Sequence, residues 1–301
     1  MPTRTTKRDF RQLSDLGVDE ILQLLNHAAA MKNQRSMGAR RKPLEGRSVA
    51  LIFEKPSTRT RVSFEVGVYE LGGHPVVMSV KDSQLGRGES IEDTARTLSG
   101  YVHAIVMRTF GRERLDAMAR AASVPVINAL TDDAHPCQIL ADLLTVLEVK
   151  RQLRGLRYAW IGDGNNVARS WAEAAGLLGL DLVMATPEEY AVPSKELPEG
   201  VTVVRDPKEA AREADVVITD VWTSMGQEAE TLRRQAAFEG YCVNRELMKN
   251  ARPGAIVLHC LPAHRGEEIG AEYLDGPEAV VWTEAENRLH AQKALLEHLL
   301  R

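Results

Sequence analysis

Short apolar runs rich in Val and Ile alternate along the chain with longer stretches of helical periodicity. Such runs are typical of parallel strands buried on both faces, and the stretches between them are typical of crossover helices. The predicted strands are residues 49–53, 76–79, 104–107, 125–128, 158–161, 182–185, 201–204, 216–219, 255–259 and 280–282. Because so many strands exceed what one mononucleotide-type sheet holds, the pattern predicts an α/β protein with two doubly wound parallel sheets.

Helical periodicity marks the segments between these strands. The predicted helices are residues 61–71, 90–99, 112–121, 135–153, 167–178, 244–250 and 284–300. The helix at 135–153 separates the two groups of strands, and the last helix can return to the first group. We therefore expect two domains joined by two interdomain helices.

The expected domain boundaries follow from these two helices. The first domain is placed at residues 1–147 and 286–301, and the second at residues 148–285. Polar surface loops are expected at 194–200 and 265–276, and a long polar loop at 81–89. Long polar loops after strands often carry function.

Composition excludes several classes of protein. The 301 residues contain 38 Lys+Arg against 42 Asp+Glu, and this net charge of −4 gives no support to nucleic-acid binding. No apolar run approaches the roughly 18–20 residues that span a bilayer, and the polar, basic start at residues 1–11 does not resemble a secretory signal. The three cysteines have no disulfide or zinc spacing, which favours a reducing cytoplasm.

Polar residues follow most predicted strands, at the edge where ligands bind in open α/β sheets. In the first half these are the Ser57–Arg61 run, Arg108, and the pair His135 and Gln138. In the second half they are Asp163 to Asn166, Asp220, Ser224, Met225 and Cys260. The pattern predicts one polar edge on each sheet.

The Ser-Thr-Arg-Thr-Arg run opens a predicted helix. Its hydroxyls, first-turn N–H groups and two guanidinium groups suit a dianionic phosphate at the positive end of the helix. The alternative is an ordinary Ser57 N-cap with solvated arginines. No Gly-x-x-x-x-Gly-Lys run is present, so this is not a nucleotide P-loop.

The remaining candidates have structural alternatives as well. His135 and Gln138 are three residues apart and share a helix face, where they could equally be a capping His and a core-edge Gln. Asp220 could cap its loop, and Cys260 could be a small core residue. Gly162-Asp163-Gly164-Asn165-Asn166 begins like a dinucleotide fingerprint, but Val167 replaces the third Gly and no acid follows the next strand. A nicotinamide cofactor is therefore disfavoured.

Taken together, the motifs resemble the ornithine carbamoyltransferases over essentially the whole chain. The motifs shared with aspartate carbamoyltransferases are Ser57 to Arg61 followed by Ser63-Phe64-Glu65, Met107-Arg108-Thr109, and His135-Pro136-Cys137-Gln138. The motifs of the ornithine branch are Asp220-Val221-Trp222-Thr223-Ser224-Met225-Gly226 and His259-Cys260-Leu261-Pro262, and Ala285-Glu286-Asn287-Arg288 matches the family's final helix.

The resemblance implies transfer of a carbamoyl group from carbamoyl phosphate to the δ-amine of L-ornithine, giving L-citrulline and phosphate without a metal or organic cofactor. It implies that carbamoyl phosphate is bound by Ser57, Thr58, Arg59, Thr60, Gln84, Arg108, His135, Gln138, Cys260, Leu261 and Arg288. It implies that ornithine is bound by Asn166, or its neighbour Asn165, and by Asp220, Ser224 and Met225. The residues implied in catalysis are Arg108, His135, Cys260 and Asp220.

The family also implies an assembly and a cellular role. We expect a homotrimer or a multiple of trimers, with Gln84 reaching a neighbour's site, and closure of the two domains around the substrates. We expect a cytoplasmic enzyme of arginine biosynthesis with no nucleic-acid or membrane partner, although the same groups would serve the catabolic direction.

Three alternatives remain. The acceptor could be aspartate, putrescine or an N-acylated ornithine, against which the Ser224-Met225-Gly226 sequence argues. A nicotinamide dehydrogenase is weakened by the broken glycine motif. A non-catalytic relative would need to have lost catalytic groups, yet every motif residue is present.

Overall fold

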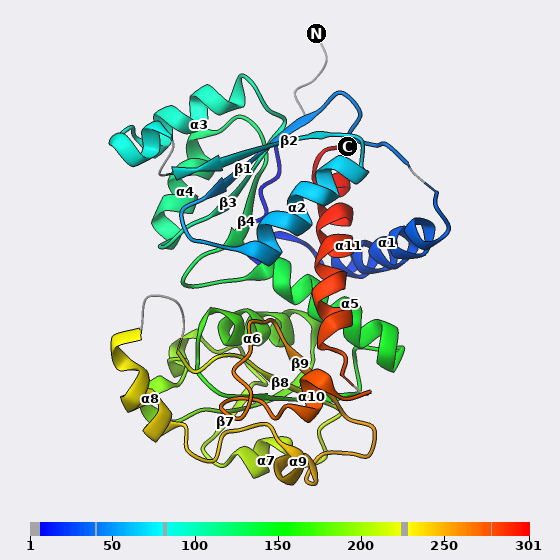
Figure 1. Cartoon of the computed structure of the whole chain (residues 1–301), viewed down its shortest axis with the longest axis vertical. Helices are drawn as coiled ribbons and strands as arrows, with labels where there is room; N and C mark the ends of the chain where they lie inside the picture. The colour runs from blue at the N-terminus through cyan, green and yellow to red at the C-terminus, as the bar shows by residue number, and fades with distance from the viewer. Residues whose placement is uncertain (1–6, 40, 81–82, 224–227, 278) are drawn as a thin grey trace. The chain divides into compact units, whose positions relative to one another are not determined.

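The computed structural model describes residues 7–39, 41–80, 83–223, 228–277 and 279–301 (Figure 1). The chain divides into two compact units. Unit 1 consists of Met1–Leu140 and Arg288–Arg301, and unit 2 consists of Ala141–Asn287. The two boundaries fall inside α5 (Pro136–Lys150) and α11 (Val281–Leu299), so each of these helices belongs to both units.

Unit 1 is built on a four-stranded parallel sheet. Its strands are β1 (Ser48–Phe53), β2 (His74–Ser79), β3 (Ala104–Arg108) and β4 (Val126–Leu130). Their order across the sheet is β2-β1-β3-β4, and Val49 of β1 pairs with Ala104 of β3. Every residue of β3 is buried, which explains the continuous apolar run before its final Arg108.

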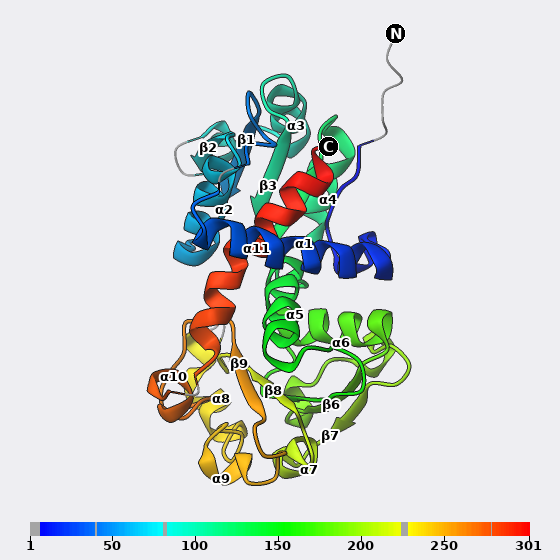
Figure 2. The ribbon, with the colours of Figure 1, turned by 90° about the vertical axis from the view of Figure 1, so that its right-hand side faces the viewer.

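Helices cover both faces of this sheet (Figure 1). On one face α3 (Ile91–Ser99) and α4 (Arg112–Ala121) bury apolar side chains against Ile52, Ile105 and Met107. On the other face lie α2 (Thr58–Glu70) and the end of α11. The helix α1 (Val18–Ser36) crosses α11, and His27 lies 3.0 Å from Glu297 there (Figure 2).

Unit 2 is built on a five-stranded parallel sheet. Its strands are β5 (Arg157–Ile161), β6 (Asp181–Ala185), β7 (Thr202–Val204), β8 (Val216–Thr219) and β9 (Ile256–His259), in the order β7-β6-β5-β8-β9. The helix α6 (Asn166–Leu178) lies on one face (Figure 1). The ring centroid of its Trp171 lies 5.6 Å from that of Tyr158 in β5.

The opposite face of the second sheet is covered by four short helices. They are α7 (Pro207–Ala211), α8 (Thr231–Ala237), α9 (Arg245–Met248) and α10 (Glu272–Asp275). Their apolar residues join Phe238, Tyr241 and Ile269 in one buried cluster with the sheet. This cluster fixes the loops that follow β8 and β9.

The strand pattern is confirmed for nine of the ten predicted segments, each within two residues of its predicted limits. The strand predicted at 280–282 is wrong, because those residues lead into the first turn of α11. The N–H of Glu284 donates to the carbonyl of Val280 (2.9 Å), and the Trp282 indole donates to the carbonyl of Leu274 (2.8 Å). Local β-propensity is overridden there by helical hydrogen bonding.

Two other regions differ from expectation. Residues 265–276 do not form only a polar surface loop, since they include α10 and the fully buried Glu268 and Ile269. The sequence patterns did not single out the 19-residue α1, whose Leu25 and Ala28 are fully buried. Among the described residues, no helix is long and apolar enough to cross a lipid bilayer.

Candidate active site

Each sheet has a topological switch point, where the strand order reverses and ligands bind in open α/β sheets. In unit 1 it lies between β1 and β3, and in unit 2 between β5 and β8. Thr60 follows β1 and Arg108 ends β3; Asn165 follows β5 and Asp220 follows β8. The candidate residues therefore lie at the switch point of each sheet.

The Ser57–Arg61 run forms the start of α2. The Ser57 hydroxyl accepts a hydrogen bond from the Thr60 N–H (3.3 Å), so Ser57 is an N-cap. Thr58 is exposed, Arg59 is half-buried, and Thr60 is buried. The first turn thus places hydroxyls and a guanidinium group at the positive end of the helix.

Two buried arginines converge on Thr60. We call Ser57–Arg61, Arg108, His135, Gln138 and Arg288 the first cluster. Nη1 of Arg108 lies 3.4 Å and Nη2 of Arg288 lies 3.0 Å from Oγ1 of Thr60, which accepts both hydrogen bonds. Nη1 of Arg288 also donates to Oε1 of Gln138 (2.6 Å). Two buried guanidinium groups beside a helix N-terminus concentrate positive charge, which suits a dianion such as a phosphate.

His135 lies directly before α5 and is buried. Burial lowers the pKa of His135 well below its usual range, and the positive charges of Arg288 and Arg108 lower it further. The imidazole is therefore neutral at physiological pH. A neutral histidine in this position can still donate one hydrogen bond from a ring N–H.

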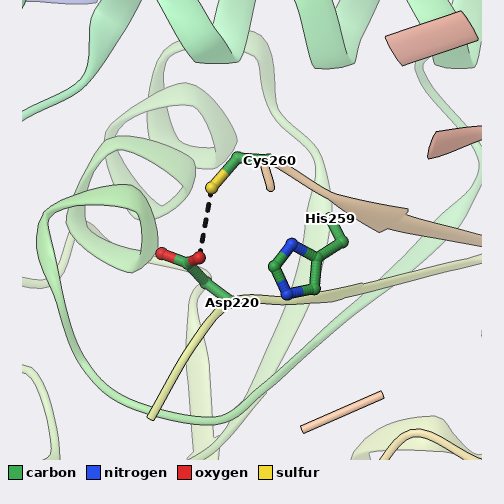
Figure 3. Close-up of side chains that lie close together, drawn as sticks. All are labelled: Asp220, His259 and Cys260. Carbon is green, nitrogen blue, oxygen red and sulfur yellow. Dashed lines mark hydrogen bonds between the residues drawn. The ribbon is translucent and has the colours of Figure 1, made fainter. Parts of the chain in front are cut away.

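A second cluster of candidate residues lies in unit 2 and is centred on Asp220 and Cys260 (Figure 3). The Cys260 thiol donates to Oδ1 of Asp220 (3.1 Å), and the Asn165 amide donates to Oδ2 of the same carboxylate (2.7 Å). Asn165 is also the N-cap of α6, because its side-chain oxygen accepts from the N–H groups of Val167 and Ala168. One asparagine thus fixes both the helix start and the carboxylate.

The Cys260 thiol stays protonated in this environment. Removal from water raises the pKa of Cys260 well above its usual range, and the carboxylates of Asp220, Glu284 and Asp142 add to the rise. A thiol is a poor nucleophile because the thiolate is the reactive form. The geometry therefore suits a hydrogen-bonding role for Cys260 better than a covalent one.

The buried residues His259 and Glu268 hold the loop that follows β9. The Leu261 N–H donates to Nδ1 of His259 (2.9 Å), so the ring proton lies on Nε2, which donates to Oε1 of Glu268 (3.0 Å). Leu261 has a φ of 59°, a left-handed conformation that costs a non-glycine residue about 1–2 kcal/mol. The hydrogen bond to His259 helps to hold it.

Arg234 holds the loop that follows Asp220. The sequence patterns did not predict this role. This buried α8 residue donates to Oδ2 of Asp163 (3.0 Å) and to the carbonyl of Trp222 (2.8 Å). Burial raises the pKa of Asp163 to about 6, and the Arg234 charge opposes that rise. Arg234 therefore anchors the loop at Trp222, which precedes the predicted acceptor residues.

The structure brings many of the predicted site residues together, but it does not describe all of them. Thr60, Arg108, Gln138 and Arg288 are joined by hydrogen bonds in unit 1, and Asp220 and Cys260 in unit 2. Gln84 is exposed in the short 3-10 helix Gln84–Arg87. Ser224 and Met225 lie outside the described residues.

Sequence reasoning missed Arg234, Glu268 and the bond from Asn165 to Asp220. A helix-capping pattern before Val167 could have indicated Asn165. No local pattern distinguishes Glu268 from the half-buried Glu267 beside it, because only the fold buries one of the two completely.

Comparison with known protein families assigns both halves of the chain. Residues 8–148 match the family described as Aspartate/ornithine carbamoyltransferase, carbamoyl-P binding domain. Residues 154–299 match the family described as Aspartate/ornithine carbamoyltransferase, Asp/Orn binding domain. The chain therefore belongs to the aspartate/ornithine carbamoyltransferase family.

Its relatives are ornithine carbamoyltransferases. The chain is 51% identical to the ornithine carbamoyltransferase of Geobacter metallireducens over 301 residues, which cover 98% of this chain and 99% of that protein. It is 55% identical to that of Acidothermus cellulolyticus over 304 aligned positions, which cover 97% of this chain and 96% of that protein.

Solved structures agree with these matches. The ornithine carbamoyltransferase from Pyrococcus furiosus has a TM-score of 0.91 and 46% identity, covering 97% of this chain and 96% of that one. The one from Burkholderia thailandensis has a TM-score of 0.90 and 44% identity, covering 97% and 98%. The family resemblance and the two-domain parallel α/β fold predicted from the sequence are confirmed.

Proposed function

We propose that this chain is a carbamoyltransferase that uses carbamoyl phosphate as donor and L-ornithine as acceptor. The lone pair of the ornithine δ-amine attacks the carbonyl carbon and forms a C–N bond. The C–O bond to phosphate then breaks, phosphate leaves with its electron pair, and the amine loses a proton. The products are L-citrulline and inorganic phosphate.

The donor binds to the first cluster. The start of α2, with Ser57, Thr58, Arg59 and Thr60, holds the phosphate together with Arg108. These groups suit the task because a buried dianion needs charge-assisted hydrogen bonds.

The carbamoyl end of the donor is held by the rest of the first cluster. Negative charge develops on the carbonyl oxygen in the tetrahedral intermediate, and Thr60, Arg108 and neutral His135 supply donors for it. Gln138 accepts from the carbamoyl amide, and Arg288, which bonds both Gln138 and Thr60, holds these groups in register.

The acceptor binds to the second cluster. Asp220 attracts the ornithine ammonium groups, and Asn166, Ser224 and Met225 complete the set that holds the α-amino and α-carboxylate groups. Asn165 orients the Asp220 carboxylate through its 2.7 Å hydrogen bond.

Cys260 and Leu261 act where the δ-amine meets the donor. The Cys260–Asp220 pair orients the amine or receives its proton, and no bond to sulfur forms. Leu261 offers backbone groups to the carbamoyl end.

We further propose that the enzyme works as a cytoplasmic homotrimer, or a multiple of trimers, in arginine biosynthesis. Within it, residues 1–147 and 286–301 bind carbamoyl phosphate and residues 148–285 bind ornithine. Gln84 contacts carbamoyl phosphate in a neighbouring subunit's site. Its exposed position on Gln84–Arg87 supports this proposal, because an exposed side chain is accessible to a neighbouring subunit.

The observation that carries the proposed activity is about 50% identity to ornithine carbamoyltransferases along nearly the full chain. The test is an acceptor panel with carbamoyl phosphate and, in turn, L-ornithine, L-aspartate, putrescine and an N-acylated ornithine. We expect kcat/KM for ornithine to exceed that for each other acceptor by at least about 10²-fold, because a site that pairs a substrate's polar groups can discriminate by more than that. A higher value for another acceptor would reassign the substrate.

A further inference from the structure

Three side chains that play no part in the proposed reaction converge at the turn after Cys260. The Nδ1 atom of His264 lies 3.7 Å from Oε2 of Glu268 and 3.9 Å from Oε2 of Glu267. One ligand atom from each residue lies within 4.8 Å of the other two. The turn is closed by the Gly266 N–H, which donates to the carbonyl of Ile269 (2.9 Å).

One carboxylate oxygen in this turn lacks a hydrogen-bond donor. Oε1 of Glu268 accepts from Nε2 of His259 (3.0 Å) and from the His264 backbone N–H (2.6 Å). Oε2 of Glu268 is fully buried and has no hydrogen-bond partner among the described residues. Leaving a buried polar atom unsatisfied is unfavourable, and more so when the group is charged.

The neighbouring histidine does not already satisfy this oxygen. A charge-assisted hydrogen bond between an imidazolium and a carboxylate is about 2.7–2.9 Å long. Both separations from His264 Nδ1 exceed that by close to 1 Å. The two separations from His264 Nδ1 are instead close to those between two ligands of one small cation.

We propose that His264, Glu267 and Glu268 form a binding site for a divalent cation, and that the cation is Zn²⁺. One imidazole nitrogen with two carboxylate oxygens is a zinc-type ligand set, with water in the fourth position. Mg²⁺ and Ca²⁺ prefer all-oxygen sites. Zn–ligand bonds of about 2.0–2.2 Å put tetrahedral ligands roughly 3.3 Å apart, so the two observed separations need to shorten by only about half an ångström.

Two of the three side chains are exposed enough to move toward a bound ion, and the third is fixed. The side chains of His264 and Glu267 are 52% and 42% exposed, so both can turn toward the ion. Glu268 is held rigidly by His259 and offers a fixed anchor. The site therefore combines one preorganised ligand with two adjustable ones.

This site is distinct from the cluster of Asp220, His259 and Cys260, which also brings together potential metal ligands. In that cluster the Asp220 oxygens accept from Cys260 and Asn165, and both ring nitrogens of His259 are engaged. A cation there would have to break these bonds. At Glu268, by contrast, it would satisfy the one oxygen that has no donor.

Bound zinc would also fix the loop beside the proposed active site. It would hold the turn through Glu268, whose other oxygen orients His259, which in turn accepts from the Leu261 N–H. The carbamoyl transfer itself does not require the ion. Zinc at this position is therefore a stabilising or modulating ligand.

The test uses the untagged full chain with Cys260→Ser, which removes the thiol ligand of the other cluster. Zinc binding is measured by competition with a chromogenic chelator. We expect one Zn²⁺ per chain, with affinity lowered at least tenfold by adding His264→Ala or, separately, Glu267→Gln. The matched control is His74→Ala, which removes an exposed histidine from β2 and should leave the affinity unchanged.

Thermal melting gives a second readout. Zinc should raise the melting temperature of Cys260→Ser and have no such effect once His264→Ala is added, because only binding to the folded state stabilises it. The proposal is overturned if Cys260→Ser binds no zinc, or if His264→Ala and Glu267→Gln bind it as tightly as their parent. Equal binding of Mg²⁺ would overturn the choice of ion.

Discussion

The thiol of Cys260 donates a 3.1 Å hydrogen bond to the carboxylate of Asp220, although 40 residues separate them in the chain. The two residues follow the neighbouring parallel strands β9 and β8, and this pairing of strand ends brings them together. The carboxylate disfavours the thiolate because a second negative charge would face it. The sulfur is thereby held as a hydrogen-bond donor.

This relationship predicts slow alkylation of Cys260. At pH 7.5, iodoacetamide should label Cys260 at least tenfold more slowly than an unperturbed thiol with a pKa of about 8.5. The Asp220→Asn variant should react faster, because it removes the nearest negative charge. Site-resolved mass spectrometry measures both rates. Labelling at the rate of a free thiol at neutral pH, or a carbamoylated Cys260 trapped during turnover, would contradict the account.

The phosphate site makes a prediction about two arginines. Arg108→Ala and Arg59→Ala should each remove about 1.5–3 kcal/mol of transition-state stabilisation, a roughly 10- to 150-fold fall in kcat/KM. Arg108→Ala should be the more damaging, because the buried guanidinium donates to Thr60 and, in the proposed mechanism, also to the carbonyl oxygen. The control is Arg96→Ala, which removes an exposed arginine that pairs with Asp93 three residues away. Near-normal turnover in Arg108→Ala would refute its double role.

The pH dependence should come from the substrate and not from His135. The ornithine δ-amine has a reference pKa near that of lysine, about 10.4, and must be neutral to attack. We therefore expect kcat/KM to rise from pH 6 toward alkaline pH. Burial, Arg288 and Arg108 lower the pKa of His135 well below its usual range, so the imidazole is already neutral where the rate is expected to rise.

The His135→Gln variant separates the two explanations, because glutamine keeps a neutral donor without titrating. It should lower kcat/KM while leaving the shape of the pH profile above pH 6 unchanged. If the acid limb disappears in this variant, the rise belongs to His135 and the assignment is wrong.

The proposed trimer predicts complementation between two poor enzymes. Gln84→Ala and Arg108→Ala are refolded together and assayed for citrulline. A Gln84→Ala chain keeps its own Arg108 and can borrow Gln84 from an Arg108→Ala neighbour, so activity should exceed both parents. Activity equal to the average of the two parent variants would contradict the proposal that Gln84 acts in a neighbouring subunit's site.

Much of the site follows from strand ends alone. Parallel strands bring their carboxyl ends to one edge of a sheet, so the order of strands and polar residues along the chain places Arg108, Asp220 and Cys260 at such edges. Arg288 could be included only through the family resemblance. Its hydrogen bond to Thr60 spans 228 residues, and no local pattern encodes such a contact.

The errors have a common physical cause. Residues 280–282 have strand propensity but lie at a helix start, where packing and helical hydrogen bonds decide. Glu268 lies in a polar segment and is nevertheless fully buried, because His259 and the His264 N–H satisfy one of its oxygens. Arg234 likewise acquires its role only through Asp163 and Trp222. Tertiary partners, which a sequence pattern does not contain, determine all three.

The central claim is that the carbamoyl group moves to the δ-nitrogen of ornithine. The direct measurement is ¹³C NMR of the reaction between ¹³C-labelled carbamoyl phosphate and ornithine carrying ¹⁵N at the δ position. The account predicts one ureido carbon signal, split by the ¹⁵N nucleus, with phosphate released in equal amount and both formed at least about tenfold more slowly in Arg108→Ala. A ureido signal without ¹⁵N coupling, or label found only in the hydrolysis products of the donor, would contradict it.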